Sequence, residues 1–507
     1  MNSLRDRIKD PYKIFGLAAI AAVVIIYVVL IMHNGYRFLN SDDSSELALA
    51  RILADQHSIL TKDWFYSSEL RVLNTNLFFA PMFYIFKSWS AVRAAGGSLL
   101  LIAYVASYLW IPYAWKYETK WFYLTAFVLI MPYAEPWQFF GLKMYYIPHV
   151  AISFVSFALL GHIFHAENNR KKTAYIALLG LFAFAAGLGG VRSVEYTYIP
   201  LFLTAFLIWF VKKSGLIPVA VAFGTLAASG VGYIVNGSVL SKIYQYHSYG
   251  NVSFIRFSFE KLEWAVDAVL ASFGYVIGEY FISFGGICNC LAFMMMILFF
   301  MMFPVLFLKR NMMSVTQEYM YWFATVTFLM NTFVMILGQN DEYADRYITI
   351  GMVPAVMLID LFYRIYIEGK TRDILIGVAI LAVFITLGIR GYLGLLHIGA
   401  NGERLGYISY LTENGYDYGY ATFWNANITT EMSDGRINMT SLDPNAEDLR
   451  IFEWLTDKTL TEKEHDKYFL VLDNNEKDKY TESEPVYQDE YYSVYDIERQ
   501  CIKEAVQ

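Results

Sequence analysis

Charged residues and cysteines are both scarce in this chain of 507 residues. Only 17% of the residues are charged, whereas 57% are hydrophobic and 18% aromatic, a balance that excludes an ordinary soluble protein. The three cysteines, Cys288, Cys290 and Cys501, cannot build a disulfide framework. The composition therefore predicts a membrane protein, and its compartment has to be inferred from topology.

Basic charge is scarce in the C-terminal part of the chain. Residues 401–507 contain 23 of the 46 acidic residues but only 10 of the 39 Lys and Arg residues, so they carry −13 and the preceding 400 residues carry +6. This contrast indicates two environments, one inside a membrane and one in water. Nucleic acid is not an expected partner, because a phosphate backbone needs a concentrated basic face.

Eleven apolar segments are candidates to cross a bilayer as helices. The first follows Arg5, Arg7, Lys9 and Lys13, which predicts a cytoplasmic N-terminus and a long external loop from residue 33 to about residue 94. The expected spans are 14–32, 95–114, 121–133, 147–164, 174–188, 196–211, 216–235, 287–308, 319–337, 347–363 and 373–392.

Two parts of the first external loop are expected to lie along the membrane surface. The segment 74–89 is interrupted by Pro81 and Lys87, and if it crossed, the later basic loops would face outward, against the positive-inside rule. We therefore predict one interfacial helix there and another from Ser44 to about Gln56. The interrupted apolar stretch 262–281 is expected to rest on the outer surface in the same way.

The composition changes abruptly after the last expected span. Strand-like runs occur at 418–423, 436–441, 468–473 and 491–497, and helix-like stretches at 402–413 and 445–456. An odd number of spans from a cytoplasmic start places this part outside. The sequence thus predicts an all-α polytopic membrane bundle over residues 1–395, followed by a small extracytoplasmic α/β domain over residues 396–507.

Polar residues that adjoin the expected spans gather at the outer face. Placing polar groups close to the bilayer costs free energy, so these residues are candidates for a functional site. Carboxylates could act as bases or bind a metal, and arginines could hold an anionic leaving group through bidentate contacts. The candidates are Asp42, Asp43, Glu69, Arg71, Glu135, Arg192, Asp345, Arg346 and Tyr347.

Two of the motifs also have purely structural interpretations. The stretch from Asp43 to Glu46 fits a helix capping box in which Asp43 is the N-cap, and spacing alone does not separate that role from a catalytic one. The glycines in 187–190 are followed by no βαβ unit, so they favour a turn at a helix end over a nucleotide-binding loop.

At two places the sequence resembles the GT-C superfamily of integral-membrane glycosyltransferases, especially its protein O-mannosyltransferase and aminoarabinose-transferase branch. The segment 40–50 is similar to the family's Asp-Glu-x-x-Tyr-x-x-x-Ala motif, with Asp42 at the catalytic acid position and Asp43 as its acidic neighbour. The segment 345–354 resembles an Arg-Tyr-x-x-Pro motif. Glu46 stands where the family has Tyr, the proline comes later, and Glu135 is a loose counterpart of an acid in the second external loop.

The resemblance implies an inverting, hexosyltransferase-type glycosyltransferase that uses a polyprenyl-phosphate sugar donor in the membrane and an extracytoplasmic glycan, lipid or protein acceptor. Asp42 would take the acceptor proton, and Arg192, Arg346 and Arg71 would stabilise the departing lipid phosphate. No cofactor is required, and a divalent metal is left unassigned because arginines can compensate a monophosphate. A transporter or flippase of a lipid-linked sugar and a non-catalytic membrane scaffold remain open alternatives.

Overall fold

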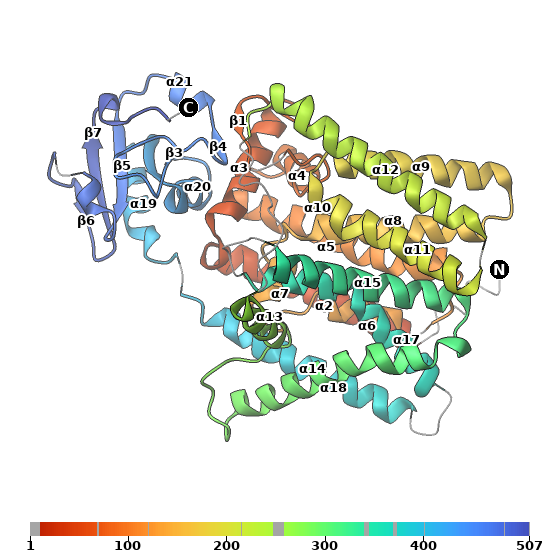
Figure 1. The fold of residues 1–507 in the computed structure, drawn as a ribbon. Helices are drawn as coiled ribbons and strands as arrows, with labels where there is room; N and C mark the ends of the chain where they lie inside the picture. Colours follow the sequence, from red (N-terminus) through yellow and green to blue (C-terminus); the bar gives the residue numbers. More distant parts are fainter. Residues whose placement is uncertain are drawn as a thin grey trace. The chain divides into compact units, whose positions relative to one another are not determined.

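The chain divides into two compact units in the computed structural model (Figure 1). Unit 1 contains Met1–Ile26, Leu100–Val235 and Gly250–His397; unit 2 contains Tyr27–Leu99, Asn236–Tyr249 and Ile398–Gln507. The structure describes residues 11–67, 70–119, 121–213, 215–246, 258–338, 344–368, 373–399, 401–480 and 482–505. Each unit is therefore built from three separate segments of the chain.

Nine helices in the described residues are long and apolar enough to cross a membrane. Each overlaps one of the expected spans, so the protein is a multi-pass membrane protein with the helical architecture that its composition predicts. The nine segments are Tyr12–Phe38, Trp89–Ala114, Ile147–His165, Val191–Lys212, Leu216–Lys242, Phe284–Leu308, Val315–Leu337, Arg346–Tyr366 and Leu375–Leu396.

Two of the eleven expected spans differ for physical reasons. Residues 121–133 form only the seven-residue helix α6 (Phe122–Val128), which is too short to cross a bilayer. Helix α9 (Asn169–Gly187) is present, but its 19 residues include Arg170, Lys171 and Lys172 in the first turn. Those charges leave an apolar part of α9 that is shorter than a full crossing.

The bundle of unit 1 is formed by pairs of neighbouring helices. Helix α8 packs against α9, α11 against α15, and α14 against both α17 and α18. The helices that lie wholly or partly in unit 1 are α2 (Pro11–Asn34), α5 (Trp89–Ala114), α7 (Glu135–Gly141), α8 (Ile147–His165), α10 (Val191–Ser193), α11 (Ile199–Lys212), α12 (Leu216–Ser238), α13 (Phe259–Ser272), α14 (Phe284–Leu308), α15 (Val315–Leu337), α16 (Arg346–Met352), α17 (Met357–Tyr366) and α18 (Asp373–Leu396). Shorter turns are the π-helix η3 (Val194–Tyr198) and the 3-10 helices η5 (Arg310–Met312) and η6 (Val353–Val356). The stretch 262–281 is helical only in α13, which ends at Ser272.

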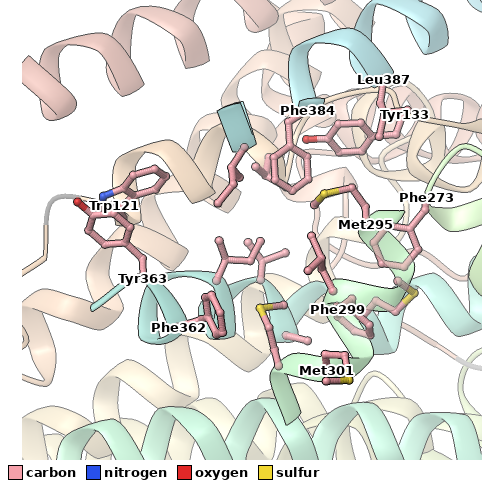
Figure 2. Close-up of a pocket in the computed structure, with 18 of the residues that line it drawn as sticks. Trp121, Tyr133, Phe273, Met295, Phe299, Met301, Phe362, Tyr363, Phe384 and Leu387 are labelled. Atoms are coloured by element: carbon pink, nitrogen blue, oxygen red, sulfur yellow. The ribbon is translucent and has the colours of Figure 1, made fainter. Parts of the chain in front are cut away.

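An apolar cavity of about 350 Å³ lies inside unit 1. Figure 2 shows aromatic and Met side chains from several helices around this space, among them Trp121, Phe299, Tyr363 and Phe384. Aromatic and Met side chains give it an apolar, adaptable lining. The bundle therefore encloses room for an apolar group of substantial size.

The C-terminal part of unit 2 is a five-stranded sheet in the order β3-β2-β5-β7-β6. Strand β2 runs parallel to β3 and β5, whereas β7 is antiparallel to β5 and β6. The strands are β2 (Tyr418–Thr422), β3 (Asn438–Leu442), β5 (Tyr468–Asp473), β6 (Tyr487–Gln488) and β7 (Tyr492–Ile497). The short helical turns are η7 (Lys477–Lys479) and η8 (Arg499–Cys501).

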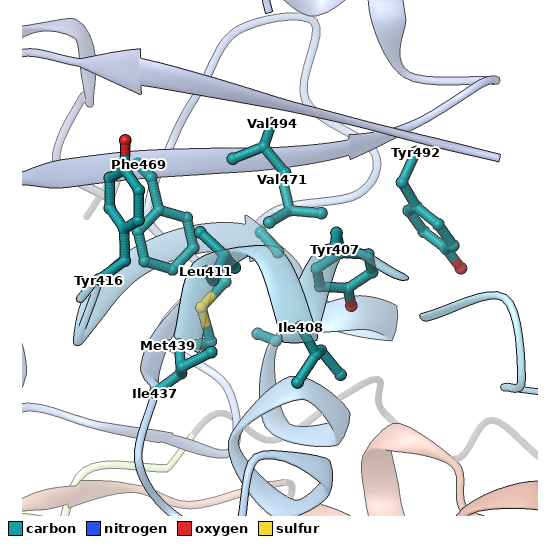
Figure 3. Packing of buried hydrophobic residues seen from close by; sticks show 12 residues of the cluster. Tyr407, Ile408, Leu411, Tyr416, Ile437, Met439, Phe469, Val471, Tyr492 and Val494 are labelled. Carbon is teal, nitrogen blue, oxygen red and sulfur yellow. The ribbon is translucent and has the colours of Figure 1, made fainter. Parts of the chain in front are cut away.

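Both faces of this sheet are buried, because successive residues of a strand point to opposite sides. Phe469 and Val471 pack with residues of α19 (Arg404–Glu413) and α20 (Phe423–Met432) on one face (Figure 3). Leu470 and Leu472 lie in a second cluster on the other face. The continuous apolar runs that predicted these strands are thus explained by burial on both sides.

The predicted elements of the tail agree with the structure except at two places. The four expected strands and the helix at 402–413 correspond to β2, β3, β5, β7 and α19. Residues 445–456 form no helix; they run as an irregular segment to the short strand β4 (Thr456–Asp457). Helix α20 was not expected, because its residues Asn425, Asn427, Thr429 and Thr430 are polar and nevertheless buried.

The loop between the first two membrane-spanning helices belongs to unit 2 together with this sheet domain. Helix α3 (Ser41–Asp55) packs against α20, and strand β1 (Trp64–Phe65) pairs antiparallel with β4. The other elements here are η1 (Gly35–Phe38), α4 (Asn76–Phe79), η2 (Ala80–Tyr84), η4 (Leu240–Lys242) and α21 (Thr459–Glu462). The expected helix over 74–89 is therefore two short turns, and Pro81 lies within the second of them.

A buried ion pair joins the loop to the sheet domain. Arg93 Nε lies 2.6 Å from a carboxylate oxygen of Glu431, and the two side chains are each only 5% exposed. A second guanidinium nitrogen of Arg93 donates to the other Glu431 oxygen, and also to the backbone carbonyl of Asp43, at 2.7 and 2.9 Å. One side chain thus contacts both α3 and α20.

We expect Glu431→Gln to destabilise unit 2 strongly, because it leaves the Arg93 charge buried without a counter-charge. The loss should be about 3–5 kcal/mol, measured as faster hydrogen exchange in α3 and α20 of the full-length protein in detergent. The matched control is Asp448→Asn, which breaks a half-exposed pair with Arg450 in the same unit and should change exchange far less. Equal effects of the two variants would contradict a dominant role for the buried pair.

Candidate active site

The acidic start of α3 is built as a capping box one turn earlier than the sequence pattern predicts. Asn40 is the N-cap: its side-chain oxygen accepts from the Asp43 amide at 2.8 Å, and Asp43 Oδ2 accepts from the Asn40 amide at 3.2 Å. The predicted box with Asp43 as the N-cap and Glu46 as its partner is therefore wrong. Asn is as good an N-cap as Asp, so the helix starts at the first suitable residue.

This correction separates the two neighbouring aspartates. Asp43 is 2% exposed and its carboxylate closes the capping box, so its structural role is fixed. Asp42 is partly exposed in the first turn of α3 and takes no part in the box. Glu46, one turn further on, accepts a hydrogen bond from the hydroxyl of Thr75. The first turn of α3, which contains Asp42 and Asp43, lies at the positive end of the helix dipole.

The other candidates of unit 2 lie in the chain between β1 and α4. Arg71 is half-buried there, next to Leu70, whose carbonyl accepts from the side chain of Asn236 at 2.8 Å. Glu69 lies outside the described residues. Asp42, Asp43 and Arg71 are thus candidates of unit 2, whereas Glu135, Arg192, Asp345, Arg346 and Tyr347 belong to unit 1.

Two arginines of unit 1 contact the same tyrosine. Arg346 Nε donates to the hydroxyl of Tyr146 at 3.2 Å, and the Arg192 guanidinium lies 5.5 Å from the centre of the Tyr146 ring. Tyr347 contacts both partners: its ring centre is 5.1 Å from the Arg346 guanidinium and 6.4 Å from the Tyr146 ring. These four side chains, which we call the arginine–tyrosine cluster, bring three predicted residues together.

The cluster borders a small pocket of about 100 Å³. Its lining residues are Tyr146, Arg192, Glu195, Tyr196, Asn331, Met335, Tyr347 and Ile350. Two hydrogen bonds fix its walls: Tyr196 donates to the Ile350 carbonyl and the Asn331 side chain to the Tyr347 carbonyl, each at 2.6 Å. Both bonds tie a neighbouring helix to α16, so the position of the cluster is fixed by packing.

The local backbone explains how Arg192 is placed. Helix α9 ends at Gly187, and Gly190 has a φ of 100°, which favours glycine. Helix α10 begins at the next residue and continues into the π-helix η3. The expected helix-end turn over 187–190 is confirmed, and its role is to direct the chain back into the bundle just before Arg192.

The acids of unit 1 gather near the start of α16. Asp345 accepts from the indole nitrogen of Trp264 at 3.2 Å. Burial raises the pKa of Asp345; the Trp264 hydrogen bond opposes this, and the nearby carboxylates of Glu135 and Asp267 raise it further. Among the described residues no three His, Cys, Asp or Glu side chains form a metal-binding group.

The arrangement in unit 1 suits a lipid-linked anion. Two guanidinium groups and a phenol can hold a phosphate by charge-assisted hydrogen bonds. Helix α16 lines both spaces described above: Tyr347 and Ile350 border the small pocket, and Met352 borders the apolar cavity of Figure 2. A ligand with an anionic head and an apolar tail would find both environments along one short helix.

Two solved structures of ArnT from Cupriavidus metallidurans are similar to this chain. The one bound to undecaprenyl phosphate has a TM-score of 0.52 at 11% sequence identity, over 96% of this chain and 98% of ArnT. The apo structure gives 0.50 at 10% identity, over 95% and 98%. The chain has the fold of ArnT.

The likeness at this identity concerns the fold alone, and it confirms the GT-C architecture that the resemblance implied. The oligosaccharyltransferase of Archaeoglobus fulgidus in complex with Zn and sulfate also matches, with a TM-score of 0.45 at 12% identity over 83% of this chain and 62% of that one. No protein-family model matches the sequence, and no curated protein matches it.

Several residues of the ArnT-like bundle were not predicted as candidates. Tyr146, Tyr196 and Asn331 line the small pocket beside the predicted arginines. Tyr146 directly precedes α8, where an aromatic residue at a membrane interface is common, so its position alone did not distinguish it. Asn331 had a usable signal, since an amide inside an apolar span is costly and calls for a specific partner.

Proposed function

We propose that this protein is an inverting glycosyltransferase that moves a sugar from a polyprenyl-phosphate donor to a hydroxyl group of an extracytoplasmic acceptor. The main support is helix α16, which carries two residues of the arginine–tyrosine cluster and lines an apolar cavity through Met352, in a chain with the fold of ArnT, one structure of which holds undecaprenyl phosphate. The hexose character of the sugar follows only from the sequence resemblance and is part of the proposal.

The proposed reaction has one displacement step. The acceptor oxygen attacks the anomeric carbon while Asp42 takes the hydroxyl proton, and the bond between that carbon and the phosphate oxygen breaks. The departing lipid phosphate keeps the electron pair, and Arg192 and Arg346 stabilise its charge. Attack opposite to the leaving group inverts the anomeric centre.

Asp42 is proposed as the base because Asp43 has a structural role in the capping box and Asp42 does not. We expect Asp42→Asn to lower turnover by about a hundredfold or more, since it keeps the size and removes the basicity. Asp43→Asn should be milder, because an amide oxygen can still accept in the capping box. Transfer assays on purified variants with matched abundance and donor binding would measure the difference. Near-normal turnover in Asp42→Asn would remove Asp42 as the general base, whereas the absence of any transfer by the unmodified protein would favour a transporter or flippase.

The apolar cavity is proposed to hold the donor tail. Ala355 lines it and is fully buried, so Ala355→Trp should fill part of the space. Each buried methylene contributes about 0.8 kcal/mol, and the loss of a few contacts should raise KM for long-chain donors by about tenfold or more. A short-chain donor should be affected much less. The control is Ala382→Trp on the exposed side of α18; an equal rise in KM for both variants would remove the assignment.

The proposed acceptor side requires that the sheet domain and the start of α3 lie outside the cytoplasm. The basic loops support this orientation through the positive-inside rule. A periplasm-active reporter fused after Gly399 and a cytoplasm-active reporter fused after Lys309 should both give signal, because the nine spans of the structure and the eleven expected from the sequence give these two sites the same sides. Cytoplasmic activity of the fusion after Gly399 would reverse the topology and place the proposed site on the wrong side.

A further inference from the structure

A polar pocket of about 420 Å³ lies within unit 2, between the first-loop segments and the sheet domain that this unit contains. One wall is the second half of α3, with strand β1 and the start of α5. The other is the end of α20, the start of β3, and the chain from β4 to Lys463. The residues that the argument uses are Arg51, Asp55, Trp64, Asn427, Asn438 and Asp457.

The charges around this pocket balance. Three basic side chains, Arg51, Lys87 and Lys463, face three acidic ones, Asp55, Asp434 and Asp457. Arg51 and Asp55 pair with each other at 2.9 Å. Asp434 accepts from the backbone amide of Trp89 at 2.6 Å. A pocket with no net charge, in which the Arg51 guanidinium is paired with Asp55, does not favour a phosphate group or a polyanion.

The remaining lining groups offer both donors and acceptors. Asn427 is held by its donation to the Leu455 carbonyl at 2.8 Å, and Asp457 Oδ1 accepts from both the amide and the hydroxyl of Thr459 at 2.8 and 2.9 Å. The indole N–H of the buried Trp64 has no hydrogen-bond partner among the described residues. That nitrogen is itself buried, so the groups that a ligand in the pocket can reach are the amides and carboxylates of the lining, such as those of Asn438 and Asp457.

The walls are held in register by backbone pairing. Trp64 is directly opposite Asp457 in the β1–β4 pair, and the Lys458 amide donates to the Asp63 carbonyl at 2.9 Å. Pocket groups that are fixed before binding lose little entropy when a ligand arrives. The walls of the pocket are thus fixed by the fold of unit 2 before any ligand binds.

The pocket opens on a different face of α3 from the proposed base. Ala48, Arg51, Ile52 and Asp55 line it, with the spacing of one helix face. Arg51 follows Asp42 by nine residues, which is about 13 Å along the axis and half a turn away around it. A ligand in this pocket would therefore be bound apart from the residues proposed to react.

We propose that this pocket binds an uncharged saccharide. Hydroxyl groups both donate and accept, so they match a pocket that has no net charge and is lined by carboxylates, amides and cations. The further statement that this saccharide is the glycan part of the acceptor rests on the proposed function. Binding itself does not, because it requires neither donor nor transfer.

The test is saccharide binding by the purified full-length protein, without donor, measured by calorimetry. The probes are neutral oligomers of glucose, mannose, galactose and N-acetylglucosamine, with inorganic phosphate and a sulfated glycan as charged probes. At least one neutral oligomer should bind. Trp64→Phe, which shortens an aromatic wall of the pocket, and Asn438→Ala, which removes a hydrogen-bonding amide, should each weaken that binding about three- to tenfold.

The matched controls are Trp424→Phe and Asn445→Ala, the same substitutions at exposed positions of unit 2 outside the pocket. They should leave the affinity unchanged, and thermal unfolding should confirm that all four variants fold. Equal weakening by pocket and control variants would overturn the proposal, and so would binding of the charged probes alone or of no neutral oligomer up to its solubility limit. Saccharide binding is measured without donor, whereas the proposed transfer reaction is tested by the activity of Asp42→Asn. A failure of the binding proposal can therefore be distinguished from a failure of the proposed function.

Discussion

The buried ion pair between Arg93 and Glu431 is the interaction on which unit 2 depends. Arg93 belongs to the start of a long apolar helix, and Glu431 to a helix of the sheet domain. Because the same guanidinium also donates to the Asp43 carbonyl, the start of α3 is positioned by Arg93, 50 residues further along the chain, and through it by Glu431, another 338 residues on. The geometry around Asp42 is thus set by tertiary contacts as well as by the capping box.

The chemistry proposed for the protein divides between its two units. Unit 1 supplies cations, phenols and an apolar interior, which suit an anionic lipid. Unit 2 supplies a carboxylate at a helix start and a neutral polar pocket, which suit hydroxyl-bearing molecules. The proposed donor is an anionic lipid in the membrane, and the proposed acceptor carries hydroxyl groups and arrives from water. Each unit therefore matches one of the two proposed substrates. The composition contrast between the first 400 residues and the tail follows this division only in part, since the first loop is in unit 2.

The sequence predicted those features that depend on neighbouring residues. Long apolar runs located the spans, and continuous apolar strands such as β5 were found because both of their faces are buried. Features that depend on distant partners were missed. Helix α20 has too polar a sequence to be recognised as a buried helix, because its buried polar side chains find partners such as Arg93, Tyr407 and the Leu455 carbonyl only in the folded chain. Proximity of Arg192, Arg346 and Tyr146 likewise follows from helix packing that no local pattern encodes.

The construction of unit 2 from three distant segments has a consequence for biogenesis. Arg93 is synthesised 338 residues before Glu431, and at a synthesis rate of about 5–20 residues per second that interval is about 20–70 s. During this time α3 and the buried arginine wait without the helix that covers them, while most of the membrane helices are inserted. Unit 2 can therefore mature only after its last segment has been synthesised. Nascent chains that stop short of α20 should remain sensitive to protease at α3, and premature termination near the end of the gene would expose the first loop as well as remove the tail.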